Sequence, residues 1–306
     1  MHLAFEHVSK LYGPVIGLND FCCRIGPGIT GLFGSNGAGK STMMKLASGQ
    51  LRPSQGRVMI GEHSAWSTAA KRNLGYSPDT DSFYESMTGR AFVTTMTRLY
   101  GYSARESRER AEKAIADVGM TDRADRKIAG CSHGMRQRIK LAQAMVHDPA
   151  VLLLDEPMTG IDPGGRREFK QLLERLAGEG KAVLVSTHIL DEIEDLADQI
   201  LMVARGRLVA SGTINDIRNL IADEPFSVEI VAEPARQLAA ALMAFGVVLS
   251  VAIRGDTLTV RTTNQMEFFG QLGKIGAEGN IAIRKLEVLD AGAEAVFGYL
   301  AGGRGA

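Results

Sequence analysis

The sequence predicts an α/β protein with a mostly parallel sheet, followed by a small C-terminal α+β domain. Short, continuous apolar runs occur at residues 29–33, 151–154 and 182–185, as expected for strands buried on both faces of a parallel sheet. A helical pattern at 166–176 joins the last two runs into a strand–helix–strand unit. After residue 224, short strands and helices alternate again. The fold class rests on these observations.

Composition and charge limit the functional classes. The chain has 306 residues, enough for one large and one smaller domain. Its 45% hydrophobic residues allow a real core and exclude global disorder. The 35 Lys and Arg residues balance the 35 Asp and Glu residues, so bulk charge does not favour a nucleic-acid partner. Cys22, Cys23 and Cys131 form no disulfide framework, and the N-terminus lacks a signal-peptide pattern. We expect a reducing compartment.

The larger domain is expected to span residues 1–215. Strands are predicted at 3–8, 21–25, 29–33, 58–60 and 74–76, with turns at the glycine and proline pairs between them. From 88 to about 147 the apolar spacing becomes helical, with breaks at 101 and 119–121. Strands at 151–154, 182–185, 200–203 and 207–210 and helices at 166–176 and 189–197 complete this domain.

The C-terminal domain is expected at residues 224–306, after a helix at 214–222 and a boundary at Glu224-Pro225. A strand at 226–230, a helix from 234, a hairpin of 247–253 and 257–262, a helix at 266–275 and a strand at 281–288 follow. This order predicts a ferredoxin-like domain. A last helix is predicted at about 293–301.

Residues 237–253 are uncharged and resemble a membrane span. The stretch is at the lower limit of spanning length and is interrupted by Gly246 and Ser250. A helix, a glycine turn and a strand explain it better. We therefore expect membrane contact only through a partner.

A phosphate-binding motif lies between the strand at 29–33 and the next helix. It fits the pattern G-x-x-x-x-G-K-[ST], and its strand–helix context favours a real loop over a glycine turn that binds nothing. Backbone N–H groups and the helix N-terminus would hold phosphates, Lys40 would neutralise them, and Ser41 would bind Mg²⁺. The predicted nucleotide-binding residues here are Gly34, Ser35, Asn36, Gly37, Ala38, Gly39, Lys40, Ser41 and Thr42.

Two carboxylates end the apolar strand at 151–154. Ligands bind at the carboxyl edge of a parallel sheet, and adjacent strand residues point to opposite sides, so the two acids have different roles. Asp155 is predicted to hold Mg²⁺ and Glu156 to polarise the attacking water as a general base. An exposed acidic strand end is the alternative, and the phosphate-binding motif makes it less favoured.

The segment Cys131-Ser132-His133-Gly134-Met135-Arg136-Gln137-Arg138 resembles the signature motif of ABC ATPases. It resembles most closely the S-H-G-M-x-Q-R variant in ATPase subunits of export-type ABC transporters. Residues 158–162 look like the D-loop, 186–188 like the switch-histidine motif, and Tyr12 like the aromatic residue that stacks on adenine. The resemblance covers about residues 1–215, with the motifs in the family's order.

The resemblance implies a P-loop NTPase core of the ABC type, with an antiparallel β subdomain and a helical subdomain at about 88–147. It implies ATP and Mg²⁺ as cofactors, and two nucleotide domains that enclose two ATP molecules. A second copy or a paralogue is thus an expected partner, together with a membrane-spanning permease at the cytoplasmic face of the membrane. The catalytic residues would be Glu156, His188 and Lys40, with Tyr12, Ser132, Gly134 and Asp162 also binding nucleotide, and with Ser41, Asp155 and Asp79 at the metal.

Two residues depart from the family pattern. Asp79 stands where the Q-loop usually has Gln, which adds a carboxylate to the nucleotide site. His133 replaces a signature glycine and adds bulk where backbone meets phosphate, unless its ring points away from the nucleotide.

Three further points stay open in the sequence. A soluble ABC-type ATPase acting on nucleic acid or ribosomes is the main alternative, although the chain lacks a second phosphate loop and sustained heptads. A small-molecule kinase would not explain the signature together with Asp155 and Glu156.

A permease-docking surface is suggested by the apolar residues Phe83, Tyr84 and Met87. Local packing under a loop is the alternative explanation for them.

Overall fold

The computed structural model describes residues 1–189, 191–194, 196–217, 226–278 and 281–289. The chain divides into two compact units, Met1–Thr213 and Ile214–Ala306. Of the helix predicted at 214–222, residues 214–217 are described and are helical. The predicted boundary at 224–225 and the predicted last helix lie outside the described residues.

A six-stranded, mostly parallel sheet forms the centre of the first unit, with the order β10-β9-β3-β8-β7-β6. Only β10 runs antiparallel to its neighbour. The strands are β3 (Gly28–Phe33), β6 (Leu74–Ser77), β7 (Val151–Asp155), β8 (Ala182–Thr187), β9 (Gln199–Ala204) and β10 (Arg207–Gly212). Every residue of β7 and β8 is buried, which confirms the interpretation of their continuous apolar runs.

An antiparallel sheet of order β2-β1-β4-β5 forms a second layer. Its strands are β1 (Leu3–Tyr12), β2 (Val15–Ile25), β4 (Gln55–Ile60) and β5 (His63–Ser64). The β1–β2 hairpin is longer than predicted, because strand pairing continues to Tyr12 and Val15 at its tip. The apolar side chains there are exposed and do not give the buried pattern from which the shorter strands were predicted.

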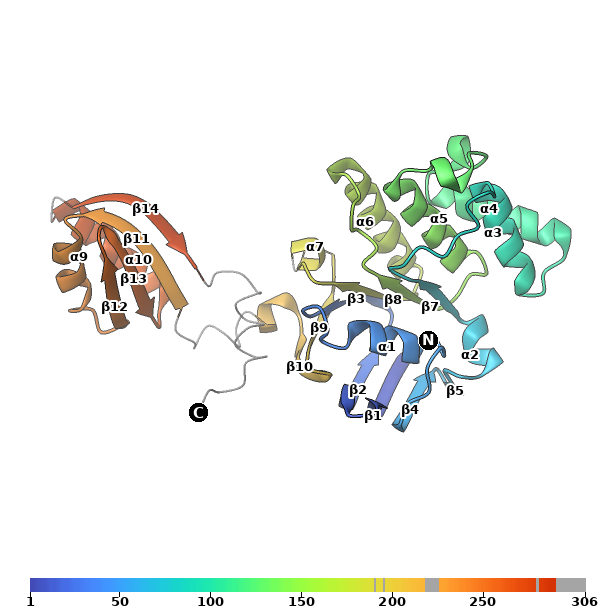
Figure 1. Cartoon of the computed structure of the whole chain (residues 1–306), viewed down its shortest axis with the longest axis horizontal. Coiled ribbons are helices and arrows are strands. Elements are labelled where there is room, and N and C mark those ends of the chain that lie inside the picture. Colours follow the sequence, from blue (N-terminus) through green and yellow to red (C-terminus); the bar gives the residue numbers. More distant parts are fainter. Residues whose placement is uncertain (190, 195, 218–225, 279–280, 290–306) are drawn as a thin grey trace. The chain divides into compact units, whose positions relative to one another are not determined.

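Helices cover the central sheet and extend from one end of it. Helix α1 (Lys40–Ala47) lies between the two sheets and contacts β2, β4 and β7 (Figure 1). Helix α6 (Pro163–Gly178) packs on β3 and β8, and the other short helices are α2 (Thr68–Arg72) and α7 (Asp191–Glu194).

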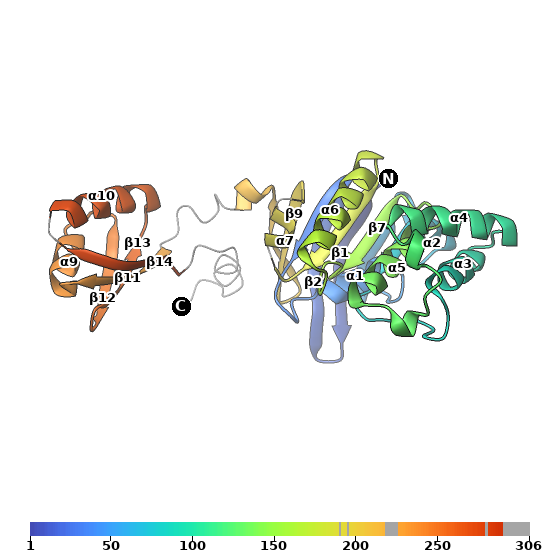
Figure 2. The same cartoon turned by 90° about the horizontal axis from the view of Figure 1, so that it is seen from above.

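A helical group occupies the region predicted at 88–147. It contains α3 (Gly89–Leu99), α4 (Ala104–Asp117), α5 (His133–Met145) and two 3₁₀ turns, Thr121–Arg123 and Ile128–Gly130. Thr88, Ser103 and Ser132 each accept a hydrogen bond from a backbone N–H of the first turn, which satisfies donors that a helix start leaves free. Figure 2 shows the three helices together beside α2 and β7.

The second unit is a four-stranded antiparallel sheet of order β12-β13-β11-β14 with two helices. Its elements are β11 (Phe226–Glu233), α9 (Ala235–Leu242), β12 (Val248–Arg254), β13 (Thr257–Thr262), α10 (Gln265–Glu278) and β14 (Ala282–Val288). This is the predicted ferredoxin-like order. The uncharged stretch at 237–253 is divided between α9 and β12, as predicted. Among the described residues, none of the helices has the length and apolar character needed to cross a bilayer.

His147 joins the helical group to the central sheet. Its Nε2 lies 3.0 Å from the Leu74 carbonyl on β6, and its ring stacks on Tyr100 with centroids 3.9 Å apart. Because the carbonyl can only accept, Nε2 carries the proton. Nδ1 is buried without a hydrogen-bond partner. Burial lowers the pKa of His147 to about 4, since a second ring proton would have no acceptor.

We therefore predict a pH-dependent loss of stability between about pH 6.5 and pH 4. The folded pKa of His147 is below its unfolded value, so the unfolded state binds more protons in this window and acid favours unfolding. The His147→Gln variant keeps an N–H donor but cannot titrate, and should lack a dependence of up to about 3 kcal/mol. Urea unfolding followed by the fluorescence of Trp66, the single tryptophan, measures this for the first unit. The His63→Gln variant is the control. If the unfolding free energy of His147→Gln depends on pH as strongly as that of His63→Gln, the prediction is contradicted.

Candidate nucleotide site

The residues predicted to bind phosphate and metal and to catalyse hydrolysis lie at one edge of the central sheet. The strands β3, β8, β7 and β6 are parallel, so their carboxyl ends meet at the same edge. The phosphate-binding loop follows β3, Asp79 follows β6, Glu156 follows β7 and His188 follows β8. Pairing of Asp155 with Ser186 and of Phe33 with Thr187 fixes how far each strand reaches.

Lys40 is the first residue of α1 and is buried inside the phosphate-binding loop. Its Nζ donates a hydrogen bond to the Gly34 carbonyl at 2.6 Å and lies 3.7 Å from Glu156 Oε1. Burial lowers the pKa of Lys40, and the charges of Glu156 and Asp155 partly oppose that shift. The loop thus holds a desolvated cation where phosphate oxygens are expected.

Asp155 is buried at the end of β7, and its carboxylate accepts a hydrogen bond from Ser186 Oγ at 2.5 Å. Burial raises the pKa of Asp155, the Ser186 hydrogen bond opposes this, and the charge of Asp79 adds to the rise. Two neighbouring carboxylates with one buried ammonium form a site that a divalent cation would stabilise, because hard cations prefer oxygen ligands. The donors present therefore fit Mg²⁺.

Glu156 leaves the strand direction at this point. Its backbone adopts a left-handed φ of 49°, and its N–H is held by Ser186 through Oγ at 3.1 Å and the carbonyl at 3.2 Å. The side chain thereby turns toward His188, whose Nδ1 lies 3.0 Å from Glu156 Oε2. The structure brings together Lys40, Glu156 and His188, the three residues predicted to be catalytic. Ser186 holds both Asp155 and Glu156. Ser186 has no predicted role of its own beyond its place in the 186–188 motif.

Tyr12 lies near the start of α1, at the end of β1. A Cβ placed on Gly17 would stand 2.7 Å from Tyr12 Cε2 and 3.3 Å from Thr42 Cγ2, so both side chains border the same spot. The Tyr12 ring is 43% exposed, with Lys10 Nζ at 5.3 Å from its centroid. Tyr12 is therefore partly exposed beside the start of α1.

The signature residues lie on the helical group. Ser132 caps α5 and accepts a hydrogen bond from the Met135 N–H at 3.4 Å, while a Cβ on Gly134 would meet open space. Within the described part of the chain, no hydrogen bond or ion pair joins either residue to the phosphate-binding loop. Asp162, predicted to bind nucleotide, caps α6 by accepting from the Gly165 N–H at 3.2 Å.

The Asp79 segment is held by α5. Lys140 is almost fully buried, and its Nζ donates to the carbonyls of Pro78 and Asp79 at 3.0 and 2.9 Å. The carboxylate of Asp81 lies 3.2 Å from the same ammonium. Sequence reasoning missed Lys140, whose position inside an amphipathic helix gives no sign of a long-range partner.

Comparison with known proteins identifies the family. Residues 19–159 match the family described as ABC transporter. The chain is 30% identical over 305 residues to the daunorubicin resistance ATP-binding protein DrrA3 of Streptomyces coeruleorubidus, covering 98% of this chain and 96% of that one. The chain belongs to the ABC transporter ATP-binding protein family. It carries that family's ATPase domain.

Other relatives agree with this assignment. The linearmycin resistance ATP-binding protein LnrL of Bacillus subtilis is 33% identical over 220 residues, or 70% of each chain. A solved structure described as the ATP-binding subunit of an ABC transporter superposes with a TM-score of 0.66 at 28% identity, covering 72% of this chain and 93% of that one. A dimeric bacterial cassette, MJ0796, at 24% identity and a TM-score of 0.64, shows the same fold over 69% of this chain and 98% of that one.

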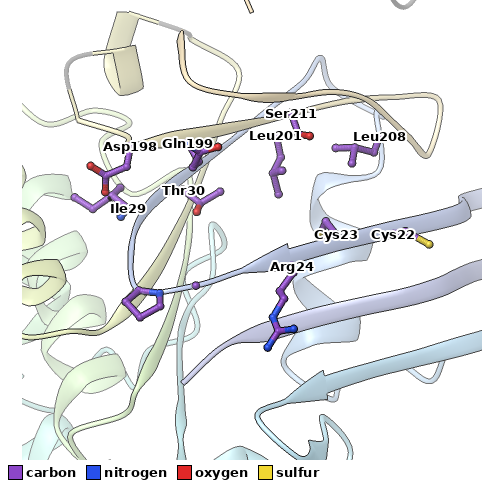
Figure 3. Close-up of a pocket in the computed structure, with 12 residues that line it drawn as sticks. Cys22, Cys23, Arg24, Ile29, Thr30, Asp198, Gln199, Leu201, Leu208 and Ser211 are labelled. Carbon is purple, nitrogen blue, oxygen red and sulfur yellow. Dashed lines mark hydrogen bonds between the residues drawn. The ribbon is translucent and has the colours of Figure 1, made fainter. Parts of the chain in front are cut away.

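This ABC ATPase domain also has a pocket of about 220 Å³ lined by residues of β2, β3, β9 and β10 (Figure 3). It opens between the antiparallel sheet and the β9–β10 edge of the central sheet, and no residue of the phosphate-binding loop lines it. The lining residues include Cys23, Arg24, Thr30, Asp198, Gln199 and Leu208.

His133, the histidine that replaces a signature glycine in this ABC ATPase, points toward the D-loop of its own chain. A Cβ on Gly160 would stand 2.7 Å from His133 Cδ2, and Gly160 has a φ of 70°. His133 Nε2 lies 3.2 Å from Nε2 of Gln137, one turn along α5. The side-chain amide can only donate through nitrogen, so His133 Nε2 accepts and Nδ1 carries the proton.

We predict that Gly160→Ala destabilises the first unit through two separable effects. A left-handed φ costs about 1–2 kcal/mol in a residue with a Cβ, and contact with the His133 ring adds to this. In a His133→Ala background only the first effect remains, so a double-mutant cycle should give a coupling of about 0.5–3 kcal/mol. Urea unfolding followed by Trp66 fluorescence measures it. Strictly additive effects of the two substitutions would contradict the observed contact.

Proposed function

We propose that this chain is the ATP-hydrolysing subunit of an exporter and acts through a separate membrane permease. The observation that carries the proposal is the Glu156 carboxylate, which lies within 3.7 Å of Lys40 and 3.0 Å of His188 at the phosphate-binding edge. The names of two relatives, resistance proteins for daunorubicin and linearmycin, support export as the direction. The permease would place the chain at the cytoplasmic face of the membrane.

ATP and Mg²⁺ would be held by the loop after β3 and by the carboxylates at the ends of β6 and β7. Lys40 neutralises phosphate oxygens, and Ser41, Asp155 and Asp79 offer oxygen ligands to the metal, which balances charge on the phosphates. Glu156 accepts the proton of the attacking water. His188 donates a hydrogen bond that orients the Glu156 carboxylate. The same histidine would also contact the γ-phosphate. Tyr12 stacks on the adenine ring.

A second subunit completes each site in this proposal. Ser132, Gly134 and Asp162 have no described bond to the phosphate-binding loop of their own chain. All three lie at helix starts, where N–H groups favour anions. They would face the nucleotide of an identical chain or a paralogue. Nucleic acid is not an expected partner, since the net charge is zero.

The alternative is an ABC-type ATPase that acts on nucleic acid or ribosomes without a membrane partner. The two readings differ in one simple observation: whether the neighbouring gene encodes a protein with about six apolar spans. Co-purification of such a membrane protein with this chain would support the transporter subunit directly.

We predict that Glu156→Gln slows ATP hydrolysis by about 10²–10⁴-fold, because the general base is lost. ATP affinity should be kept, since Lys40 and the loop remain, and ATP should then trap a dimer. Phosphate release under single-turnover conditions, ATP titration calorimetry and light scattering measure the three quantities. Near-normal turnover would overturn the assignment of Glu156. Thr159→Ala, which removes only a weak 3.5 Å contact to Glu156, is the matched control.

The docking surface proposed for the permease is centred on Tyr84. The Phe83 ring packs edge-on against Phe92 with centroids 5.1 Å apart and lies under the Arg136 guanidinium, so local packing explains Phe83. The Tyr84 side chain is 61% exposed and is free to meet a partner. Arg136 also holds the residue that follows Tyr84, through a bidentate pair with Glu85 at 2.7 Å.

We predict that Tyr84→Ala keeps basal ATP hydrolysis but weakens binding to the permease, because only an exposed apolar contact is removed. Phe83→Ala should instead lower the unfolding free energy of the first unit, because it removes part of a packed ring pair. Pull-down of the co-expressed permease and an ATPase assay on the same preparations distinguish the two. Unchanged pull-down and unchanged transport with Tyr84→Ala would remove Tyr84 from the docking surface.

A further inference from the structure

We propose that His7, Asp20 and Cys22 form a surface binding site for a zinc-class divalent cation. One ligand atom from each of these residues lies within 4.8 Å of the other two. His7 Nδ1 is 2.8 Å from Asp20 Oδ1, and Cys22 Sγ is 3.1 Å from the His7 backbone nitrogen. The three side chains come from the adjacent strands β1 and β2 and are exposed, so an ion can reach them from solvent.

Two successive bulges in the β1–β2 ladder create this arrangement. Phe5 pairs with Cys23 and Val8 with Phe21, so two residues of β1, one of them His7, oppose Cys22 alone. Between Val8 and Lys10 the extra residue falls on β2, where Asp20 lies. A bulge redirects a side chain that regular alternation would send elsewhere. Here both bulges direct their side chains toward Cys22.

The backbone holds both bulged residues in uncommon conformations. His7 and Asp20 have left-handed φ values of 50° and 47°, which non-glycine residues seldom adopt. The Asp20 N–H donates to Ser9 Oγ at 3.0 Å. On the other side of β1, a Cβ at Gly56 would stand 2.1 Å from the His7 carbonyl oxygen, so the bulge depends on a glycine in β4. The geometry of the three side chains is therefore built in before an ion arrives.

The donor set selects the metal. An imidazole nitrogen, a carboxylate oxygen and a thiolate sulfur are ligands of Zn²⁺, whereas Mg²⁺ prefers oxygen alone. Ligand atoms on one tetrahedral zinc ion stand about 3.3 Å or more apart, from the usual bond lengths. The His7–Asp20 pair at 2.8 Å must therefore open slightly, and its hydrogen bond is replaced by two metal bonds. The neutral imidazole then carries its proton on Nε2 instead of Nδ1, so that Nδ1 offers its lone pair to the metal.

Binding would release the Cys22 thiol proton to solvent, since only the thiolate is a metal ligand. The Sγ already accepts the His7 N–H, which holds the sulfur beside the other two ligands. Three protein ligands leave a fourth position for water. The ion would link β1 to β2, and Figure 3 shows the Cys22 sulfur beside Cys23 on β2 at the margin of the pocket. This site is separate from the oxygen-only Mg²⁺ site.

Alkylation of Cys22 tests the proposal on the full-length protein without nucleotide. Iodoacetamide modification is followed by tandem mass spectrometry, which distinguishes Cys22 from Cys23. We expect Zn²⁺ to slow alkylation of Cys22 at least about tenfold, because a metal-bound thiolate is a poor nucleophile. Cys131, a half-buried free cysteine in another part of the chain, should change by less than about twofold. Mg²⁺ alone should protect neither. Equal protection of Cys22 and Cys131 would overturn the site.

The other ligands are tested with His7→Asn and Asp20→Asn, because asparagine tolerates a left-handed backbone. Each variant should lose most of the protection of Cys22, while His63→Asn, an exposed histidine of the same sheet, should keep it. Protection that survives in both ligand variants would mean that zinc binds the thiol alone, and would refute the proposal. As an independent measurement, Co²⁺ bound to the wild-type protein should give a thiolate charge-transfer band that Cys22→Ser lacks. Absence of that band in the wild type would also refute it.

Discussion

The parallel register of β3, β8 and β7 is the constraint on which the nucleotide site depends. Asp155 is paired with Ser186 across β7 and β8, which places the Ser186 hydroxyl where it can hold both the Asp155 carboxylate and the Glu156 N–H. A slip of one residue would send each side chain to the opposite face. The two acids would then exchange sides, and neither would have the environment that it needs. The apolar sides of these strands, all buried, make that register costly to change.

Charge balance follows from that geometry. One buried ammonium, Lys40, faces three carboxylates, and its pKa is lowered by burial while that of Asp155 is raised. Burial disfavours the charged form of each group, so the site is short of positive charge for its acids. A divalent cation that arrives with phosphates would supply it. The same physical argument explains why Asp79 in place of the usual amide is compatible with a metal site.

The helical group is connected to this site by charged side chains rather than by apolar packing alone. Lys140 and Arg136 both lie on the helix that begins at the signature. Lys140 holds the carbonyls of Pro78 and Asp79, and Arg136 pairs with Glu85 further along the same segment. Helix α5 also contacts β6 and β7 directly. Helix α5 therefore links the Asp79 segment to the D-loop, because the ring of His133 lies against Gly160. The signature, the D-loop and the Asp79 segment are thus connected through side chains of α5.

The sequence by itself determined the local features that depend on short-range patterns. Apolar runs predicted the buried strands, and the spacing of glycines and Lys40 predicted a phosphate-binding loop between a strand and a helix. These inferences succeed because burial on two faces and tight turns each restrict residue types locally. The motif order placed Glu156 and His188 in the same site, and the parallel sheet brings them within hydrogen-bond distance.

Only the tertiary structure decided the contacts between distant segments. Bulges in the β1–β2 hairpin direct His7 and Asp20 toward Cys22, although strand alternation says nothing of such a cluster. Packing of Phe83 on Phe92 and the ring of His133 against the D-loop likewise have no sequence signal. The physical reason is that these contacts depend on register, bulges and helix placement. Those are set by the packing of the whole unit and not by the residue types next to them in the chain.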